Sequence, residues 1–354
     1  MWKSFTALVG ATLFVAAAWA QSTGNLEAYL KPDHPESYTV VKGDTLWDIS
    51  GKFLTKPWLW PELWRANPQI ENPHLIYPGD VIRLVYIEGK PALIVDRGEA
   101  GKTYRASPSS SEKLEPKIRV TPLETPIPAI NLGAIQGFLV QNRVVAPAIL
   151  DDAPYVIQGE SDRLVVGGGD RVYVRGKLQD SQSYSFVRKG PLYQDPVTNE
   201  VLGQEATYIG LGRVVGQEND IATVYVSSSR EEVQIGDRVL PTEERSVEAT
   251  FFPSAPKDEV DGEIIAVTNG VTQVGQFDVV VIDRGERNGL VDGNVLAIYK
   301  KGALTRDRIA NQTVQLPSER AGLMMVFRVF DKLSYALVLA TERPLAVFDE
   351  VKNP

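Results

Sequence analysis

Few side chains in this sequence could support catalysis. The chain has 354 residues, no cysteine and two histidines, His34 and His74. These counts exclude disulfides, a thiol nucleophile and a zinc–thiolate site, and they disfavour a histidine-rich metal site. A Ser-His-Asp triad in the C-terminal part would have to take its base from the first 74 residues. Carboxylates are therefore the one class of catalytic group that the composition leaves open, as paired Asp and Glu do in glycosidases.

Two short patterns match catalytic or phosphate-binding motifs in form only. Ser110-x-x-Lys113 lies in a Pro/Ser-rich stretch without the companion motifs of a serine enzyme. Gly210, Gly212 and Gly216 are one residue off G-x-G-x-x-G and lie among predicted strands rather than at the start of a helix. We therefore predict that the protein is not an enzyme, and that it holds no cofactor and no metal.

Length and charge limit the architecture and the partners. A chain of 354 residues suggests two to three domains, and 23 prolines with 29 glycines favour turns and β-structure over long helices. The formal net charge of −8 argues against nucleic acid or an anionic membrane surface as a charge-driven partner.

Residues 1–20 have the pattern of a secretory signal peptide. Lys3 provides a positive start, Thr6–Ala18 is an uncharged and mostly apolar core, and an A-x-A site ends at Ala20, so we predict cleavage between Ala20 and Gln21. An uncleaved N-terminal anchor is the alternative. No later stretch is long and apolar enough to span a bilayer. The mature chain is therefore predicted to be periplasmic and to have no transmembrane segment.

Residues 38–87, after an N-terminal linker at 21–37, carry the clearest order of elements. A β-branched run leads into a turn at Gly43, and Asp44 is predicted to be the N-cap of a first helix. Leu46, Ile49 and Phe53 would form the apolar face of that helix. A second helix is predicted to begin between Pro57 and Pro61, with an apolar stripe, and to end before Asn67-Pro68. A turn and a strand from Val81 to Ile87 complete a βααβ order. The stripe of the second helix comprises Leu59, Leu63 and Ala66.

Two stretches of this segment resemble a LysM domain: residues 41–49 (VKGDTLWDI), and Asn67-Pro68 followed by residues 75–82 (LIYPGDVI). The resemblance implies binding of glycans that contain N-acetylglucosamine, chiefly peptidoglycan in bacteria, in a shallow groove between the first strand–helix loop and the loop before the last strand. The glycan-binding residues that it implies are Gly43, Asp44, Thr45 and Leu46 on one lip, and Asn67, Pro68, Leu75, Ile76, Tyr77, Pro78 and Gly79 on or near the other.

The chemistry of the segment suits a neutral sugar. An N-acetyl sugar presents amide and hydroxyl groups to polar atoms, and a methyl group and C–H faces to apolar surface. Gly43 and Asp44 could equally have only the structural roles of permitting a turn and capping a helix. Trp60 and Trp64, at i and i+4, favour packing over ligand contact. His74 is predicted to be a loop residue with no chemical role. Sugar stacking or core packing is open for all four tryptophans of the segment, Trp47, Trp58, Trp60 and Trp64.

The remainder is predicted to be β-rich. Residues 88–154 are expected to be a linker and irregular connecting region, and short runs divided by Gly, Pro and Asp follow, such as Val279–Ile282. Residues 210–241 and 322–354 look like two copies of one unit. We expect an α+β protein in which the LysM domain precedes two related small β-modules, at 155–241 and 260–354. The aligned pairs are Gly210 with Gly322, Val214 with Val326, Ala222 with Ala336, and Asp237 with Asp349, with a looser match of residues 169–174 to 293–299.

The predicted function is that of an exported, non-enzymatic protein that binds peptidoglycan through its LysM domain and presents its β-modules to an unidentified envelope protein. The chain also resembles, more loosely, bacterial LysM-containing envelope proteins whose C-terminal part has no assigned activity. Two alternatives stay open. One is a cell-wall hydrolase that uses carboxylate catalysis and is targeted by LysM. The other is an envelope assembly factor that binds protein rather than glycan.

Overall fold

The computed structural model describes residues 26–64, 76–87, 89–96, 143–163, 165–179, 182–242, 251–268 and 273–354. The predicted signal peptide with its Ala20–Gln21 cleavage site lies outside these residues, as do Asn67, Pro68, His74 and Leu75. Within the described ranges, no helix is long and apolar enough to cross a membrane.

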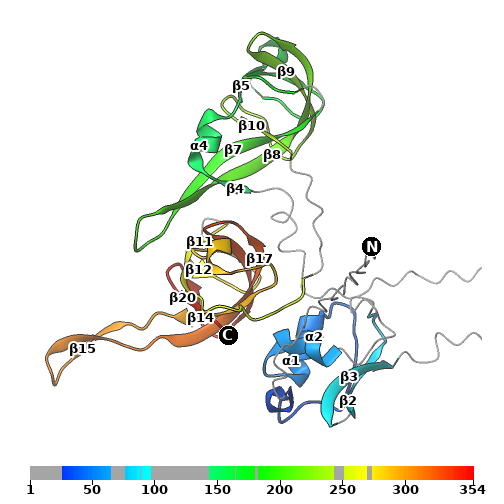
Figure 1. Ribbon diagram of the computed structural model, residues 1–354, viewed down its shortest axis with the longest axis vertical. Coiled ribbons are helices and arrows are strands. Elements are labelled where there is room, and N and C mark those ends of the chain that lie inside the picture. Colours follow the sequence, from blue (N-terminus) through cyan, green and yellow to red (C-terminus); the bar gives the residue numbers. More distant parts are fainter. Residues whose placement is uncertain are drawn as a thin grey trace, which may run out of the picture.

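The N-terminal unit is a three-stranded antiparallel sheet, β1-β2-β3, packed against short helices (Figure 1). Its core contains Ile49, Phe53, Trp60, Leu63 and Ile82, each almost fully buried. In chain order the elements are η1 (Leu26–Tyr29), β1 (Ser37–Thr39), α1 (Leu46–Phe53), η2 (Pro57–Leu59), α2 (Trp60–Trp64), β2 (Val81–Ile87) and β3 (Lys90–Asp96).

The N-cap of α1 is Thr45, and the prediction of Asp44 was wrong. Thr45 has extended backbone angles directly before the first helical residue, and its hydroxyl accepts a 3.1 Å hydrogen bond from the Asp48 backbone N–H. The Asp48 carboxylate accepts from the same hydroxyl at 2.7 Å, so the two side chains hold the helix start together. The Asp44 carboxylate instead closes the preceding turn by accepting from the Val41 backbone N–H at 2.9 Å.

The N-terminal sheet extends beyond residue 87, into the segment that was expected to be linker. β3 pairs with β2 along its whole length, from Val81 opposite Asp96 to Ile87 opposite Lys90. Leu93 and Val95 of β3 are buried in the same core as Phe53. The added strand covers apolar surface that β1, β2 and the helices would otherwise leave open to water.

The middle unit is a seven-stranded antiparallel sheet in the order β4-β8-β7-β10-β5-β6-β9. Because β9 also pairs with β8, six of these strands form a closed ring. β4 and α4 belong to this unit although they fall in the expected connecting region, since β4 pairs with β8. The elements are β4 (Arg143–Val145), α4 (Pro147–Asp152), β5 (Tyr155–Gly159), η5 (Glu160–Asp162), β6 (Arg171–Arg175), β7 (Ser183–Gln194), β8 (Val201–Glu218), β9 (Ile221–Ser229) and β10 (Arg238–Pro241).

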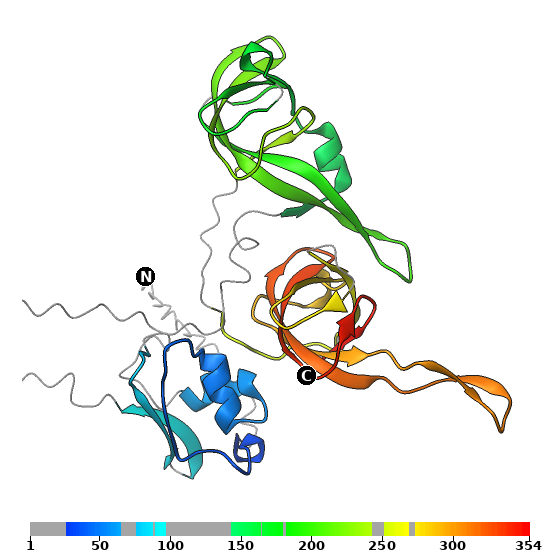
Figure 2. The ribbon, with the colours of Figure 1, turned by 180° about the vertical axis from the view of Figure 1, so that it is seen from behind.

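The C-terminal unit is a closed barrel in the order β11-β13-β18-β17-β14-β20, and a two-stranded hairpin projects from it (Figure 2). We call this hairpin, β15 and β16 with their connections to the barrel (residues 300–320), the arm. The elements are β11 (Asp261–Val267), β12 (Gln273–Val274), β13 (Val279–Ile282), η6 (Glu286–Asn288), β14 (Val295–Lys300), β15 (Leu304–Asp307), β16 (Gln312–Gln315), β17 (Glu319–Val329), β18 (Ser334–Thr341), β19 (Leu345–Ala346) and β20 (Glu350–Lys352).

The two rings have the same connectivity. Numbered along the chain, the six strands of each ring are neighbours in the order 1-2-5-4-3-6. The pairing register of β8 with β9 and of β17 with β18 corrects the alignment of the two sequence repeats. Val214 pairs with Val224 and Val326 pairs with Ala336, so the position equivalent to Ala336 is Val224 rather than Ala222. The match of residues 169–174 to 293–299 was also wrong, because it equates a second strand (β6) with a third (β14).

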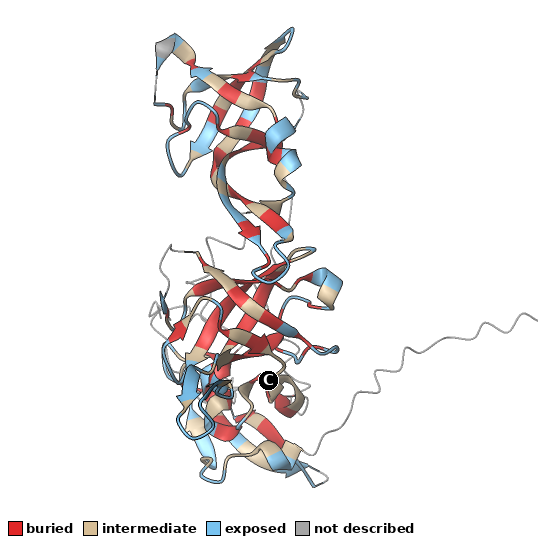
Figure 3. Cartoon of the chain, turned by 90° about the vertical axis from the view of Figure 1, so that its left-hand side faces the viewer, coloured by how far each residue is buried: buried red, intermediate tan, exposed pale blue. Residues whose placement is uncertain are grey.

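Two strands of the barrel, β13 and β18, are buried on both faces. Figure 3 marks the buried residues of the described chain in red. Successive residues of a strand point to opposite faces. In β13, Val280 and Ile282 belong to the core inside the barrel, whereas Val281 belongs to a second cluster on the outside. We call this outer face, with Tyr335 and Leu337 of β18, the outer wall. Runs such as Val279–Ile282 are uninterrupted apolar sequence, which is the pattern of a strand covered on both sides rather than one facing water.

The outer wall is covered by side chains from the other two units. Tyr193 and Leu202, from the β7–β8 hairpin, are buried in its cluster, and so are Trp47 and Trp58 of the N-terminal unit. Arg287 on η6 donates to both carboxylate oxygens of Glu200 at 2.9 and 3.0 Å, beside the apolar contact. The barrel is therefore the unit against which the other two pack.

Candidate functional site

Two turns of the same form lie side by side in the N-terminal unit. In the first, the Asp44 N–H donates to the Val41 carbonyl at 3.2 Å. In the second, the Asp80 N–H donates to the Tyr77 carbonyl at 3.0 Å, and the Asp80 carboxylate accepts from the Tyr77 N–H at 3.0 Å. The third residue of each turn is a glycine with positive φ, Gly43 at +102° and Gly79 at +97°. Glycine adopts this conformation at little steric cost, which explains its position in both turns.

Backbone hydrogen bonds fix these two turns to each other. The Gly79 N–H donates to the Val40 carbonyl at 2.8 Å, and the Val40 N–H donates to the Asp80 carbonyl at 2.9 Å. The strand–helix loop and the loop before β2 are therefore one rigid platform with two adjacent lips. We call this platform the paired turns, residues 41–44 and 77–80.

The Asp44 carboxylate supports the first lip from beneath. It accepts a 2.9 Å hydrogen bond from the Tyr38 hydroxyl as well as the bond from Val41 N–H. Partial burial, and then the hydrogen bond to Asp44, raise the pKa of Tyr38 above its ordinary value of 10.0. The Lys52 ammonium lies 4.7 Å from the centre of the Tyr38 ring. Both hydrogen bonds fall on Oδ2 of Asp44 and shape the lip, so its carboxylate acts as a structural acceptor.

The predicted site residues separate into three groups. Gly43 and Gly79 are exposed, and Asp44, Tyr77 and Pro78 are partly exposed, all on the paired turns. Thr45 is buried as the helix cap, and the Leu46 and Ile76 side chains are buried in the core, so a ligand could reach only their backbone. The remaining three, Asn67, Pro68 and Leu75, lie outside the described residues.

The four tryptophans of this unit all pack, on two different surfaces. Trp60 and Trp64 lie in the core of the N-terminal unit. Trp47 and Trp58 stack on each other, with ring centroids 6.5 Å apart, and are buried in the cluster of the outer wall. Sequence reasoning considered a sugar ligand or the domain's own core and missed this third role. The spacing of these residues could have indicated two different surfaces, since Trp58 and Trp60 are two residues apart at a break between two short helices.

A turn of the same hydrogen-bonding form recurs in the described β-rich units. The same turn, in which the fourth residue's side chain accepts from the first residue's N–H, precedes β6, β10, β13, β14 and β20. In these turns an Asp or Asn stands directly before the strand, and its side chain closes the turn. A Gly-Asp pair alone does not mark a ligand site; what is particular to residues 41–44 and 77–80 is that two such turns are bonded together.

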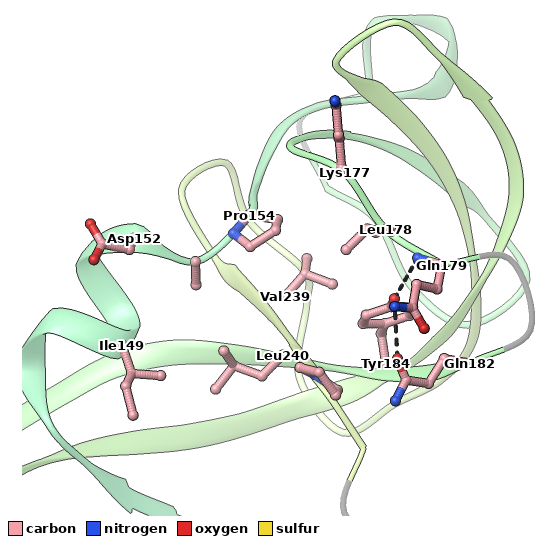
Figure 4. A pocket seen from close by; sticks show the side chains of 12 residues that line it. Ile149, Asp152, Pro154, Lys177, Leu178, Gln179, Gln182, Tyr184, Val239 and Leu240 are labelled. Atoms are coloured by element: carbon pink, nitrogen blue, oxygen red, sulfur yellow. Dashed lines mark hydrogen bonds between the residues drawn. The ribbon is translucent and has the colours of Figure 1, made fainter.

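Two cavities lie away from the paired turns. One, of about 330 Å³, is in the middle unit between α4 and the end of the ring (Figure 4). Its lining is mainly apolar, and the Tyr184 hydroxyl at its edge accepts a 2.7 Å hydrogen bond from the Gln179 N–H. The other, of about 320 Å³, is lined by charged residues of the β7–β8 hairpin and the barrel.

Two carboxylates of the second cavity, Asp283 and Asp195, hold backbone N–H groups. Asp283 accepts from the Glu263 N–H at 2.7 Å, and burial raises the pKa of Asp283. Asp195 accepts from the Val197 and Thr198 N–H groups, which lowers its pKa. Asp195 closes a local turn, whereas Asp283, directly after β13, joins that strand to β11, so both side chains have structural roles. No group of three or more potential metal ligands occurs among the described residues.

Comparison with known families assigns the N-terminal unit. Residues 38–85 match the model of the LysM domain, so the protein carries a LysM domain near its N-terminus, followed by a largely β-rich remainder. The family is one of glycan-binding modules rather than catalytic domains. The match ends within β2, and so β3 is outside it.

A curated relative matches a short part of the chain. The chain is similar to the "Uncharacterized protein YqbP" of Bacillus subtilis (strain 168), with 38% identity over 60 residues. The match covers 14% of this chain and 27% of the relative, so the chain spans about a quarter of that protein.

Proposed function

We propose that this protein is an exported, non-enzymatic peptidoglycan-binding protein of the periplasm. Its LysM domain would hold the chain on the cell wall, and its β-rich part would present surfaces to other envelope components. The observation that carries the proposal is the pair of bonded turns at residues 41–44 and 77–80 within a matched LysM domain.

The site suits an uncharged glycan. Its exposed residues are Val41, Lys42, Gly43 and Gly79, with Tyr77 and Pro78 partly exposed, so most of this surface offers close backbone approach and apolar contact. The nearby carboxylates are satisfied by the protein's own N–H and O–H donors. Binding would therefore rest on hydrogen bonds and contact with sugar faces rather than on ion pairs.

The proposal for the rest of the chain follows from topology and sequence. The identical ring connectivity supports two copies of one β-module, at residues 155–241 and 260–354. The A-x-A site before Gln21 supports export. The absence of cysteine and the structural hydrogen bonds of the cavity carboxylates Asp195 and Asp283 favour a binding protein over a hydrolase.

The test is a pull-down of the chain from Gln21 onward with purified peptidoglycan sacculi. Gly43→Asn and Gly79→Asn each add a side chain to one lip. A Cβ at either position meets no heavy atom within 4 Å, and Asn is among the residues that best tolerate positive φ. We expect both variants to remain folded and to lose about tenfold or more in affinity for sacculi, as a loss of about 1.4 kcal/mol would give.

A matched control is available in the middle unit. Gly169 has φ +99°, occupies the same place in the same kind of turn, and also has open space around its Cβ position. Gly169→Asn should therefore have the same effect on stability and none on sacculus binding. Equal binding by all three variants, or no enrichment of the unmodified chain with sacculi, would show that the paired turns do not bind peptidoglycan. Release of soluble muropeptides would favour the hydrolase instead.

A further inference from the structure

One end of the C-terminal barrel carries the arm and two exposed turns together. The turns at Phe277 and Phe348 lead into β13 and β20, and both strands begin at the end of the barrel where β14 passes into the arm. The Lys300 ammonium, at the base of the arm, lies 3.4 Å from the carboxylate of Asp349. The Arg343 N–H donates to the Ala321 carbonyl, which ties the loop before β19 to the other strand at the base of the arm. We call this end of the barrel the arm pole.

Phenylalanine occupies a strained position in both turns. Phe277 has φ +67° and Phe348 has φ +72°, although the other five turns of this form have glycine there. Both rings are exposed, by 41% and 52%. A non-glycine residue at positive φ destabilises the folded state, and an exposed ring gains little stabilising free energy from burial. Neither residue is explained by folding alone, which points to contact with something outside the chain.

The arm adds further exposed apolar side chains at the same pole. Ile309, at its tip, is 98% exposed and Leu304 is 71% exposed. Among the described strands, β15 and β16 pair only with each other, and in the figures the arm projects away from the other coloured units (Figures 1 and 2). A two-stranded hairpin is marginally stable by itself in water. An apolar tip on such a hairpin is therefore placed to gain from a partner.

The charge of the arm indicates the kind of partner. Residues 300–320 contain five basic and two acidic side chains, a net charge of +3 in a chain of −8. Arg306 and Arg308 both precede Ile309 near the tip, with Asp307 between them. Within the part of the chain that the structure describes, Arg308 and Arg320 have no acidic partner. At physiological salt, charges more than about 8 Å away are largely screened, so a projecting arm is governed by its own charge rather than by that of the whole chain.

We propose that the arm pole docks on an anionic phospholipid bilayer. Ile309 and the two phenylalanines would enter the boundary between headgroups and acyl chains, while the guanidinium groups of Arg306 and Arg308 contact lipid phosphates. Long basic side chains suit this position because their stems can lie along apolar surface while the charge stays among headgroups. The whole-chain charge disfavours such a surface, and the local charge of the arm reverses that expectation.

The experiment is co-sedimentation of the chain from Gln21 onward with sucrose-loaded vesicles, of phosphatidylcholine alone or mixed with phosphatidylglycerol. No peptidoglycan is present, so the outcome is independent of glycan binding. We expect the bound fraction to rise about tenfold with the anionic lipid and to fall as salt is raised, since screening weakens charge attraction. Ile309→Asp and Arg308→Glu should each reduce binding to anionic vesicles about tenfold.

The β7–β8 hairpin provides the matched control. Val197, near its tip, is also a highly exposed apolar residue, and Val197→Asp should leave vesicle binding unchanged. Phe348→Asn, which suits positive φ, should lower vesicle binding without loss of thermal stability. Binding that is equal for both lipid compositions, or reduced as much by Val197→Asp as by Ile309→Asp, contradicts the proposal. Concentration-dependent self-association through Ile309 without vesicle binding would make a second copy the occupant and overturn the lipid assignment.

Discussion

The Tyr193 hydroxyl donates a 2.6 Å hydrogen bond to Oε2 of Glu205, and both side chains are buried where the β7–β8 hairpin meets the barrel. Burial raises the pKa values of Tyr193 and of Tyr335 on the outer wall, so both hydroxyls stay protonated. A buried carboxylate is stable only when donors satisfy it. This bond joins two strands of the middle unit and places a polar pair beside Tyr335 of the barrel, so the junction between the two β-rich units is polar as well as apolar.

Tyr193→Phe should destabilise the protein by about 1–3 kcal/mol, because it removes a donor from a buried carboxylate. Urea unfolding measured by fluorescence would give the change in free energy. Tyr173→Phe is the control, since the Tyr173 side chain is only partly buried on β6 and its hydroxyl bonds to no described residue. A loss no greater than that of the control would mean that Glu205 is satisfied without Tyr193.

Acid should weaken the same junction through Glu200. Hydrogen bonds from Arg287 and Lys332 lower the pKa of Glu200 to about 2 from its ordinary value of 4.5. A lowered pKa in the folded state means that the ion pairs stabilise fully above pH 4.5 and that this contribution is lost as the pH falls from 4.5 towards 2. The difference in unfolding free energy between the unmodified chain and Glu200→Gln should disappear over that range. A difference that stays constant with pH would contradict the assignment.

Trp58→Ala and Trp60→Ala should have different consequences although the residues are two apart. Trp60 is in the LysM core, and its loss should cost about 3–5 kcal/mol and abolish sacculus binding by unfolding the domain. Trp58 packs with the outer wall, so its loss should release the LysM domain from the barrel while sacculus binding persists. Small-angle scattering would detect the release as an increase in the radius of gyration. Identical behaviour of the two variants would refute the separation of roles.

The LysM domain should need β3 to fold. A fragment of residues 26–96 should melt cooperatively, whereas a fragment of residues 26–87 should not, because it lacks the buried Leu93 and Val95. Loss of one buried leucine costs about 2–5 kcal/mol, a large part of the stability of so small a domain. Thermal melts followed by circular dichroism would compare the two fragments. Equal melting temperatures would place the domain boundary at residue 87 after all.

Local patterns were sufficient for the elements of the LysM unit. Gly43 and Gly79 occupy positions that require positive φ, and such turns are encoded by adjacent residues. The apolar spacing of Leu46, Ile49 and Phe53 likewise identified α1. The helix cap was misplaced by one residue because Asp44 and Thr45 are both good capping residues. Only the competing bonds of Asp44 to Val41 and Tyr38 decide between them.

The pairing of strands that are far apart in the sequence could not be predicted from such local patterns. The sequence by itself determined a LysM motif, a β-rich remainder and the turns that divide it. Only the tertiary structure decided that β3 joins the LysM sheet, that each ring closes through its second and fifth strands, and that Trp47 and Trp58 meet the outer wall. Turns and helix starts depend on residues that are neighbours in the chain. Sheet closure and packing between units depend on which apolar surfaces meet, and a strand buried on both faces shows that it has a partner without showing which one.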